Sequence, residues 1–190
     1  MTQTNLLVLG SINVDLVTKV NNLPAQGETV FAETFLIENG GKGANQAVSA
    51  ARLGAKVSMI GRVGFDDFGR QVLRNLEEES VNTKMVTEDN DNNTGIALIT
   101  IDSRSHNTIV VSSGANMTCG VTELRYLEAS LAKTDCLILQ NEVPYVVNLK
   151  AARLARGKGI QVVWDPAPFV TDTEELIKNV DYLTPNQNEA

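Results

Sequence analysis

Short runs of mostly apolar residues recur along the chain and predict strands that are buried on both faces. Strands of this kind are typical of parallel sheets, because helices cover both faces of such sheets. Four runs fit the description: residues 6–9, 57–60, 136–139 and 160–164. Residues 180–183 form a further short run just before Pro185. The pattern therefore predicts a sheet with buried, parallel strands.

The segments between these runs carry apolar residues with the period of an amphipathic helix. The spacing predicts helices over residues 45–53, 68–76, 121–131 and 146–154. Strands that alternate with helices of this length form β-α-β units with right-handed crossovers. We therefore expect an α/β fold, with a doubly wound, mostly parallel sheet and helices on both faces.

Two regions interrupt this alternation and favour antiparallel strands. Residues 28–37 are rich in Thr, Val and Phe, and residues 94–102 and 107–111 carry β-forming residues on either side of a polar turn. We expect these strands to form a small β-lid, inserted into the α/β domain at about residues 16–38 and 94–112. The only histidine lies in the predicted turn, so we expect it to be exposed and non-catalytic.

Composition and charge narrow the class of partner. The 190 residues are 43% hydrophobic, which is ordinary for a soluble globular protein. Acidic residues outnumber basic ones by 23 to 16 and no basic block occurs, so we expect no nucleic-acid partner. We also expect a cytoplasmic protein without a membrane partner, because no leader-like segment or long apolar run is present. Cys119 and Cys136 stand in no metal-ligand spacing and are expected to be reduced thiols.

The first motif with candidate chemistry follows the first predicted strand and reads Gly10-Ser-Ile-Asn-Val-Asp15. In open α/β sheets, ligands bind beyond the carboxyl ends of the strands. Asp15 could accept hydrogen bonds from two neighbouring hydroxyls, and Asn13 could both donate and accept, which suits a polyol. The alternative is an Asx turn in which both side chains serve only the backbone.

A second motif, Asn39-Gly-Gly-Lys-Gly-Ala-Asn45, stands just before a predicted helix. Glycines allow the chain to approach a ligand closely, and the free N–H groups at a helix start favour oxygen-rich or anionic groups. The motif is not a Walker A loop, because Gly43 follows Lys42 where Ser or Thr is required. It is not a dinucleotide fingerprint either, because position 46 is Gln. By spacing alone, it could also be a flexible hinge ahead of the helix.

Together these motifs resemble, in their residues and their order along the chain, those of the ribokinase family of carbohydrate kinases. The resemblance covers essentially the whole chain, and it continues through Gly61-Arg-Val-Gly64, Asp66-Asp-Phe-Gly69, Gly114-Ala-Asn116, Leu139-Gln-Asn-Glu142, Asp165-Pro-Ala-Pro168 and Thr184-Pro-Asn186. It implies a ribokinase-like fold and ATP-dependent phosphorylation of a pentose, D-ribose, to D-ribose 5-phosphate. Mg²⁺ and an activating monovalent cation, K⁺, are implied as cofactors of the full-length parent.

The resemblance also implies which residues form the site. Those expected around the sugar are Asn13, Asp15, Gly41, Lys42, Gly43, Asn45 and Glu142. Asn186 and Glu189 match an Asn-x-x-Glu element near the nucleotide phosphates and hydrated Mg²⁺, where Glu189 is the carboxylate suited to the metal. Lys42 could instead be a solvated surface lysine. Asp165 stands where many members carry Asn, and we expect a structural turn role for it.

Family members carry a second signature, Asp-Thr followed by Gly-Ala-Gly-Asp, which provides an anion hole and the catalytic base. The sequence contains no Gly-Ala-Gly-Asp, and the helix that would open at Glu189 has no body. We therefore expect residues 1–190 to be an incomplete ribokinase-like α/β domain, with the C-terminal part of the fold missing. Such a chain would have no catalytic residue and no kinase activity by itself.

Other functions fit the same motifs. One is a non-catalytic sugar-binding or regulatory remnant, and another is a kinase for deoxyribose or a nucleoside. A Rossmann-type dehydrogenase is disfavoured by the failed glycine fingerprint. The resemblance to bacterial relatives also implies a homodimer, in which two subunits pair through their lids and cover otherwise open strand edges.

Overall fold

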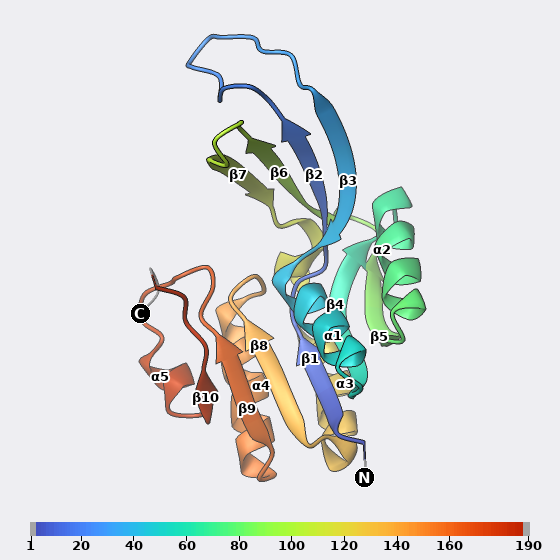
Figure 1. Ribbon diagram of the computed structural model, residues 1–190. Helices are drawn as coiled ribbons and strands as arrows, with labels where there is room; N and C mark the ends of the chain where they lie inside the picture. The colour runs from blue at the N-terminus through green and yellow to red at the C-terminus, as the bar shows by residue number, and fades with distance from the viewer. Residues whose placement is uncertain (1–2, 188–190) are drawn as a thin grey trace.

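The computed structural model describes residues 3–187 and shows an α/β body with a smaller sheet projecting from one end (Figure 1). The larger sheet has the strand order β10-β9-β8-β1-β4-β5, and all of its pairings are parallel. Its strands are β1 (Asn5–Leu9), β4 (Lys56–Gly64), β5 (Asn82–Asp89), β8 (Cys136–Gln140), β9 (Gln161–Asp165) and β10 (Tyr182–Leu183). The expected parallel sheet is confirmed.

Helices cover both faces of this sheet, as the periodicity predicted. Two of them, α1 (Lys42–Arg52) and α2 (Asp67–Glu78), pack on one face. The opposite face is covered by α3 (Val121–Ser130), α4 (Tyr145–Gly157) and the short α5 (Glu174–Ile177). Figure 1 shows the two groups on opposite sides of the strands. The fold is therefore a doubly wound α/β domain.

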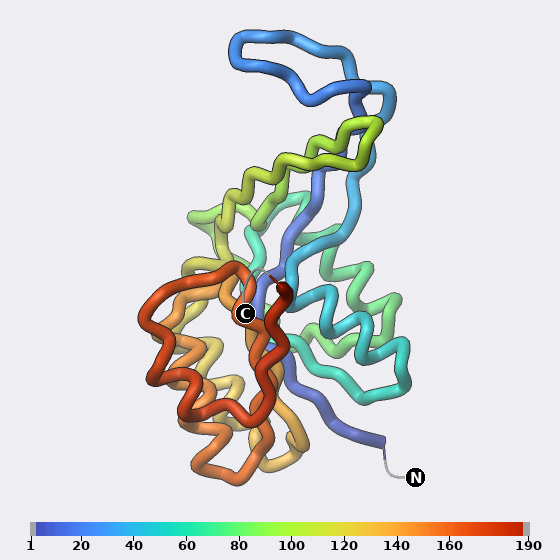
Figure 2. The backbone as a smooth tube through the Cα atoms, turned by 60° about the vertical axis from the view of Figure 1, so that its left-hand side comes forward, coloured from blue at the N-terminus to red at the C-terminus, as the bar shows by residue number. Residues whose placement is uncertain are grey.

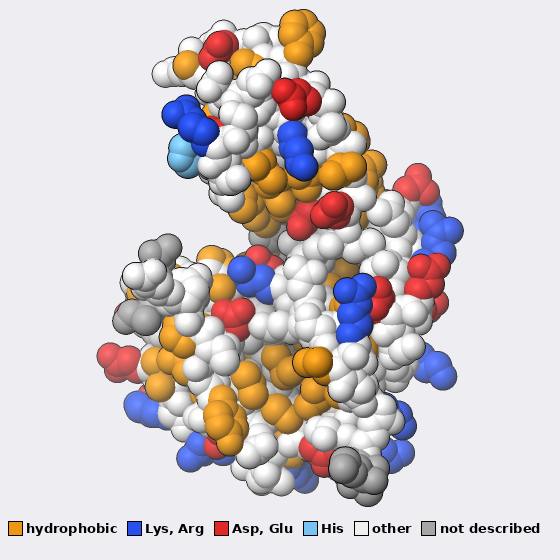
Figure 3. Space-filling view, viewed as in Figure 1, with side chains coloured by type: hydrophobic (Ala, Val, Ile, Leu, Met, Phe, Trp, Pro, Cys, Tyr) orange, Lys and Arg blue, Asp and Glu red, His pale blue; other side chains and the backbone are white. Residues whose placement is uncertain are grey.

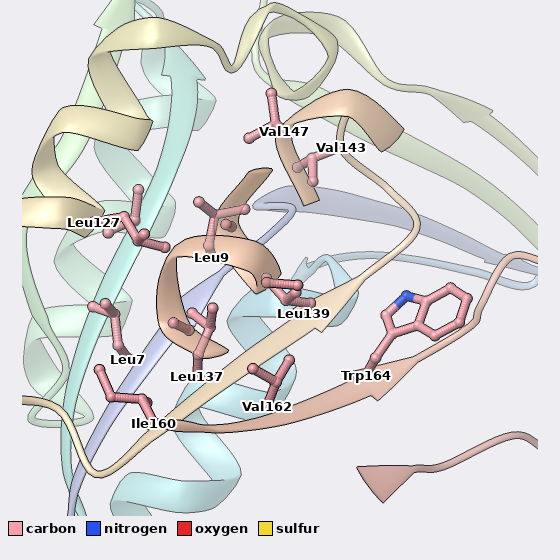
Figure 4. Packing of buried hydrophobic residues seen from close by; sticks show 14 of the residues in the cluster. Leu7, Leu9, Leu127, Leu137, Leu139, Val143, Val147, Ile160, Val162 and Trp164 are labelled. Carbon is pink, nitrogen blue, oxygen red and sulfur yellow. The ribbon is translucent and has the colours of Figure 1, made fainter. Parts of the chain in front are cut away.

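The apolar runs lie in two cores because successive side chains of a strand point to opposite faces. Leu7 and Leu9 of β1 pack with Leu137 and Leu139 of β8 under α3 and α4 (Figure 4), whereas Val8 belongs to the core under α1 and α2. All five side chains are at most 1% exposed. Each strand thus needs apolar residues on both of its faces, which is why the sequence shows mostly apolar runs and not a strict alternation.

The second sheet has four strands in the order β3-β2-β6-β7. They are β2 (Asn13–Lys19), β3 (Thr34–Gly40), β6 (Gly95–Ile101) and β7 (Asn107–Ser112). β2 and β6 are parallel, and the other two pairs are antiparallel. The strands project away from the α/β body, and a long connection between β2 and β3 reaches farthest (Figure 2). That this sheet acts as a lid stays a prediction.

The prediction of a strand from residue 28 was wrong in its first part. Residues 28–33 belong to the exposed connection between β2 and β3, and β3 begins only at Thr34. Thr34 lies opposite Lys19, the last residue of β2, so residues before it have no strand to pair with. High β-propensity in this segment, including the fully exposed Phe31, therefore produces no strand.

Helix α1 also begins earlier than predicted. Gly41 is the N-cap, with φ of 90°, and the helix starts at Lys42. The second half of the glycine-rich motif is therefore the first turn of α1, held at the carboxyl edge of the parallel sheet. This placement brings its backbone N–H groups close to the loop that follows β1.

Candidate functional site

The candidate site lies where the four-stranded sheet joins the α/β body. β1 passes through a short loop, residues 10–12, directly into β2, and β3 ends at Gly40 just before α1. β8 ends beside β1 and leads to Glu142. The carboxyl edge of the parallel sheet thus meets the root of the second sheet. The surface between the α/β body and the four-stranded sheet is hollowed (Figure 3).

Glu142 ties three of these segments together. Its Oε2 accepts hydrogen bonds from Ser11 Oγ at 2.5 Å and from the backbone N of Lys42 at 3.0 Å. Ser11 in turn accepts from the backbone N of Gly43 at 3.3 Å through Oγ, and from that of Ala44 at 2.9 Å through its carbonyl. The glycine-rich turn is therefore bound to the loop after β1 and does not form a free hinge. Sequence reasoning missed Ser11.

Glycine is required in this turn because other backbone lies against it. A Cβ on Gly43 would stand 2.8 Å from the carbonyl carbon of Gly10 and from the backbone N and O of Ser11. A Cβ on Gly41 would stand 2.8 Å from the backbone N of Asn13, at a φ that other residues rarely adopt. The missing side chains allow α1 to begin directly against the loop that carries Asn13.

Asp15 is the carboxylate of the site that has no hydrogen-bond partner within residues 3–187. Its side chain packs against Gly40, where a Cβ would lie 2.2 Å from Oδ1. Partial burial, together with the charges of Glu142 and of Glu38 across the β2–β3 pair, raises the pKa of Asp15. A half-buried carboxylate without donors is poised to accept hydrogen bonds from a ligand.

The raised pKa of Asp15 has a stability consequence. The ionised carboxylate is less favourable in the folded chain than in the unfolded chain, so protonation of Asp15 stabilises the fold. This stabilisation is fully present below the unfolded pKa and is lost as pH rises through the folded pKa. We expect Asp15→Asn to raise the midpoint of thermal unfolding at pH 7, and this gain to disappear near pH 3. Calorimetric scans at the two pH values test it, and a variant less stable than the original chain at pH 7 would contradict it.

Asn13 is 3% exposed and its side chain does not serve its own backbone. Its Oδ1 accepts a hydrogen bond of 2.7 Å from Nδ2 of Asn116, a residue that sequence reasoning did not assign to the site. Asn116 comes from Gly114-Ala-Asn116, a motif within the family resemblance, which was the one signal that could have pointed to it. The Asx-turn alternative is therefore not what the structure shows for Asn13.

The remaining predicted sugar residues lie at the start of α1. Lys42 is half-buried, and its ammonium group forms no ion pair with any residue between 3 and 187. Asn45 is exposed and lines, with Asn39 and Gly40, a cleft of about 330 Å³ between α1 and α2. Lys42 is thus free to contact a ligand, whereas Asn45 stands at the margin of the site.

Of the two residues predicted to lie near the nucleotide, the structure describes only one. Asn186 is exposed, three residues beyond the end of β10, and Glu189 lies outside the described residues. Asp165 accepts from the backbone N of Ala167 at 3.1 Å and from Gln46 Nε2 at 3.1 Å, which is a turn and packing role. Within the described part of the chain, no group of three His, Cys, Asp or Glu side chains could hold a metal.

Neither cysteine belongs to the site. Both are free, and burial raises the pKa of the Cys119 thiol to about 12. The part of the chain between residues 3 and 187 also contains no helix with the length and apolar character needed to cross a bilayer.

A parallel, doubly wound sheet with a glycine-lined polar site at its carboxyl edge defines an α/β protein with a candidate site for a small polar ligand. The sequence model of the pfkB family of carbohydrate kinases matches residues 3–190, and the chain belongs to that family. The resemblance seen in the sequence is thereby confirmed.

Curated relatives agree with this assignment. The chain is 41% identical to a ribokinase of Haemophilus influenzae over 97% of its length and 43% identical to one of Lactococcus lactis over 98%. These alignments span 60% and 62% of the two relatives, so the chain is about three fifths as long as the proteins it matches. It is also 36% identical, over 97% of its length, to a deoxyribokinase of Salmonella typhi, of which it spans 61%.

Solved structures share the fold. A ribokinase of Giardia lamblia superposes with a TM-score of 0.90 at 27% identity, covering 99% of this chain and 58% of that one. A ribokinase of Arabidopsis thaliana, complexed with ribose and ATP, superposes with a TM-score of 0.85 at 29% identity, covering 99% and 62%. The expected ribokinase-like fold is confirmed by these neighbours.

Proposed function

We propose that the chain is the sugar-binding part of a cytoplasmic kinase that transfers a phosphoryl group from ATP to a pentose, D-ribose, to give D-ribose 5-phosphate. The observation that carries the proposal is Asp15, a half-buried carboxylate without a donor, beside the glycine-lined start of α1. Relatives of 41% and 43% identity that are named ribokinases support the substrate class. The neighbour solved with ribose and ATP supports the nucleotide.

The site residues suit a ring that carries adjacent hydroxyls. Asp15 would accept hydrogen bonds from two of them, and the missing side chains at Gly41 and Gly43 let the ring approach the backbone. Lys42 would contact the sugar or the incoming phosphate, because its charge is not neutralised within the described chain. Glu142 would hold the loop after β1 and the start of α1 at the distance that the ring requires.

ATP and Mg²⁺ would meet this chain beyond the end of β10. Asn186 would lie near the phosphates, and Glu189, which is outside the described residues, would act on the hydrated metal. The lack of a three-ligand cluster in residues 3–187 fits Mg²⁺, which binds mainly to phosphates and waters. Bound there, Mg²⁺ would neutralise charge on the transferred group. K⁺ is proposed from the family resemblance, without an assigned ligand.

Sugar binding by the chain itself tests the proposal. Calorimetry should detect D-ribose binding, and Asp15→Asn should weaken it by about 100-fold, because hydrogen bonds to charged groups contribute about 1.5–3 kcal/mol each. Asp67→Asn is the matched control, since this carboxylate is 97% exposed on α2, and it should leave the affinity unchanged. Absence of ribose binding by the unmodified chain, or equal binding by Asp15→Asn, would overturn the proposal.

Deoxyribose is the second candidate substrate, because the chain is 36% identical to a deoxyribokinase. Titrations with D-ribose and 2-deoxy-D-ribose under the same conditions decide between them, and tighter binding of the deoxy sugar would reverse our assignment. We expect binding without turnover from the 190 residues alone, because their sequence contains no Gly-Ala-Gly-Asp. ADP release with ribose would contradict this expectation.

We also propose that two copies pair through the four-stranded sheet, which would serve as a lid. Leu16 of β2 lies opposite Ile37 and Leu98, and Leu98 lies opposite Val110, so these side chains share one face. Ile37, Leu98 and Val110 remain 47%, 48% and 64% exposed. Asp15 is on the other face, which must stay open to the sugar. The Leu16 face is therefore the one left for a second copy.

Substitutions on the Leu16 face and on the Asp15 face of the four-stranded sheet distinguish a loss of dimerisation from a general loss of sheet stability. Val110→Lys should convert a dimer into a monomer in sedimentation experiments, because it would bury a charge in the contact. Ile109→Lys is the matched control, since Ile109 is 53% exposed on the Asp15 face and should leave the dimer intact. A monomeric original chain, or dissociation of both variants, would contradict the assignment of the face.

A further inference from the structure

Asn116 is a buried asparagine whose amide is fully used. It lies in η1 (Gly114–Thr118), a turn of 3₁₀ helix that follows β7, and is 1% exposed. Its Oδ1 accepts from the backbone N of Ile12 at 2.9 Å. Its Nδ2 lies within hydrogen-bonding distance of three acceptors: Ile12 O at 3.2 Å, Asn13 Oδ1 at 2.7 Å and Ser113 O at 3.0 Å.

These contacts fix the orientation of the Asn13 amide. The backbone N–H of Ile12 can only donate, so the Asn116 atom facing it must be the oxygen. The other Asn116 atom is then the nitrogen, and the Asn13 atom that it meets must be an oxygen. Asn13 Nδ2 therefore points away from Asn116. This assignment starts from a backbone N–H, which is always a donor. A side-chain amide taken alone could be flipped, with its O and N exchanged.

The outward-facing Nδ2 of Asn13 has no acceptor among residues 3–187, although the residue is 3% exposed. This N–H pair retains some accessible surface, so a ligand or water can reach it and complete its hydrogen bonds. Asp15, two residues along the same strand, has a carboxylate without a donor. The site thus presents a donor and an acceptor side by side, which matches a hydroxyl group that accepts from one and donates to the other.

The surroundings hold the Asn116–Asn13 pair in place. A Cβ on Gly95, the first residue of β6, would lie 2.2 Å from Asn13 Oδ1 and 2.4 Å from Asn116 Nδ2, so only glycine leaves room for the hydrogen bond. η1 is anchored by a 2.7 Å hydrogen bond from Thr118 Oγ1 to Asp89 Oδ2 at the end of β5. The pair is therefore built into the root of the four-stranded sheet, where β2, β6 and β7 meet.

We propose that Asn116 is a positioning residue that makes Asn13 a hydrogen-bond donor to a sugar hydroxyl. Asn116 itself does not touch the sugar. It directs Nδ2 of Asn13 into the site. The sugar hydroxyl must therefore accept a hydrogen bond from Asn13 and donate one to Asp15. This inference rests on the proposed function, because it names how that same site reads a hydroxyl.

A double-mutant cycle on D-ribose affinity tests the inference in the chain of 190 residues. Asn116→Ala should weaken binding about tenfold in the original chain and less than twofold in an Asn13→Ala background, because its effect passes through Asn13. Thermal unfolding of each variant establishes that it is folded at the titration temperature. Equal losses in the two backgrounds, or an unchanged affinity of Asn116→Ala, would overturn the inference.

A second variant reads the polarity directly and does not depend on the folding of Asn116 variants. Asn13→Asp keeps the shape and can still accept from Asn116 Nδ2, but it turns an oxygen toward the site in place of Nδ2. It should lose at least as much ribose affinity as Asn13→Ala. Binding as tight as that of the original chain would refute the donor role.

A buried asparagine elsewhere separates positioning from stability. Asn148 on α4 is 0% exposed and donates from Nδ2 to Gln140 O at 2.6 Å. Asn148→Ala should lower the unfolding midpoint as Asn116→Ala does, yet leave ribose affinity unchanged. If the original chain does not bind ribose, both the proposed function and this inference fail. If it binds ribose but the effects of Asn116→Ala and Asn13→Ala are additive, only this inference fails.

Discussion

Gly43→Ala is expected to destabilise the fold by about 3 kcal/mol and to abolish the proposed sugar binding, because overpacking a tight contact forces the backbone apart. The new Cβ would stand 2.8 Å from three backbone atoms of Gly10 and Ser11. The helix cannot retreat without loss, since the backbone N–H groups of Gly43 and Ala44 are both bonded to Ser11. Urea unfolding and ribose calorimetry measure the two effects.

Gly157→Ala is the matched control for this substitution. Gly157 is the last residue of α4, and a Cβ there would meet nothing within 4 Å. Because alanine is a better helix former than glycine, by about 1 kcal/mol in a helix interior, the control should be neutral or slightly stabilising. A Gly43→Ala variant that unfolds at the same urea concentration as the original chain would show that the turn can relax, contrary to our expectation.

Arg62→Met is expected to cost about 3–5 kcal/mol, the usual loss when one partner of a buried ion pair is removed. Arg62 on β4 pairs with Glu123 at 3.0 Å and with Asp89 at 3.3 Å, and these two carboxylate side chains are 0% and 8% exposed. Methionine would fill much of the volume but leave two buried charges without their cation. The exposed pair of Arg153 with Glu175 provides the control, and Arg153→Met should cost at most about 1 kcal/mol.

The same cluster predicts a dependence on acid. Burial works against ionisation of Glu123, but hydrogen bonds from Thr87, from the backbone of Gly120 and from Arg62 hold its pKa below the usual value. The hydrogen bond from Thr118 and those from the following turn lower the pKa of Asp89 further. Stability from both groups is therefore present above their unfolded pKa values, about 4. It is lost as pH falls through the folded ones.

Unfolding midpoints between pH 7 and pH 3 check both parts of this prediction. The original chain should lose stability steadily below about pH 4.5, where the unfolded carboxylates begin to take up protons. The difference between the original chain and Arg62→Met should shrink over the same interval, because protonated carboxyl groups no longer need the cation. A difference that stays constant down to pH 3 would show that Arg62 acts by packing alone.

Four strands of the larger sheet were predicted from mostly apolar runs because their environment favours such runs. β1, β4, β8 and β9 lie inside the parallel sheet, so both of their faces are covered. β5 was missed because it is an edge strand with mostly half-exposed residues, and its sequence, Asn-Thr-Lys-Met-Val-Thr-Glu-Asp, has no such run. α5 was missed because one turn is too short for a helical period to show.

The candidate site likewise contains residues that the sequence predicted and residues that it did not. Asn13, Asp15, the glycine-rich turn and Glu142 belong to local motifs, and the structure brings them to one edge of the sheet. Ser11 and Asn116 were not predicted, because their roles arise from hydrogen bonds to residues 131 and 104 positions away. Such pairings depend on how the strands are ordered in space, and a single sequence contains no local period that reports them.

The central place of β1 has a consequence for how the chain is made. Its residues pair with β4 on one side and with β8 on the other, so Leu6 lies opposite both Val57 and Cys136. During synthesis at about 5–20 residues per second, β1 is made some 130 residues before β8, so its second edge stays uncovered for several seconds. Until then it presents an apolar, half-paired strand to chaperones and to other nascent chains.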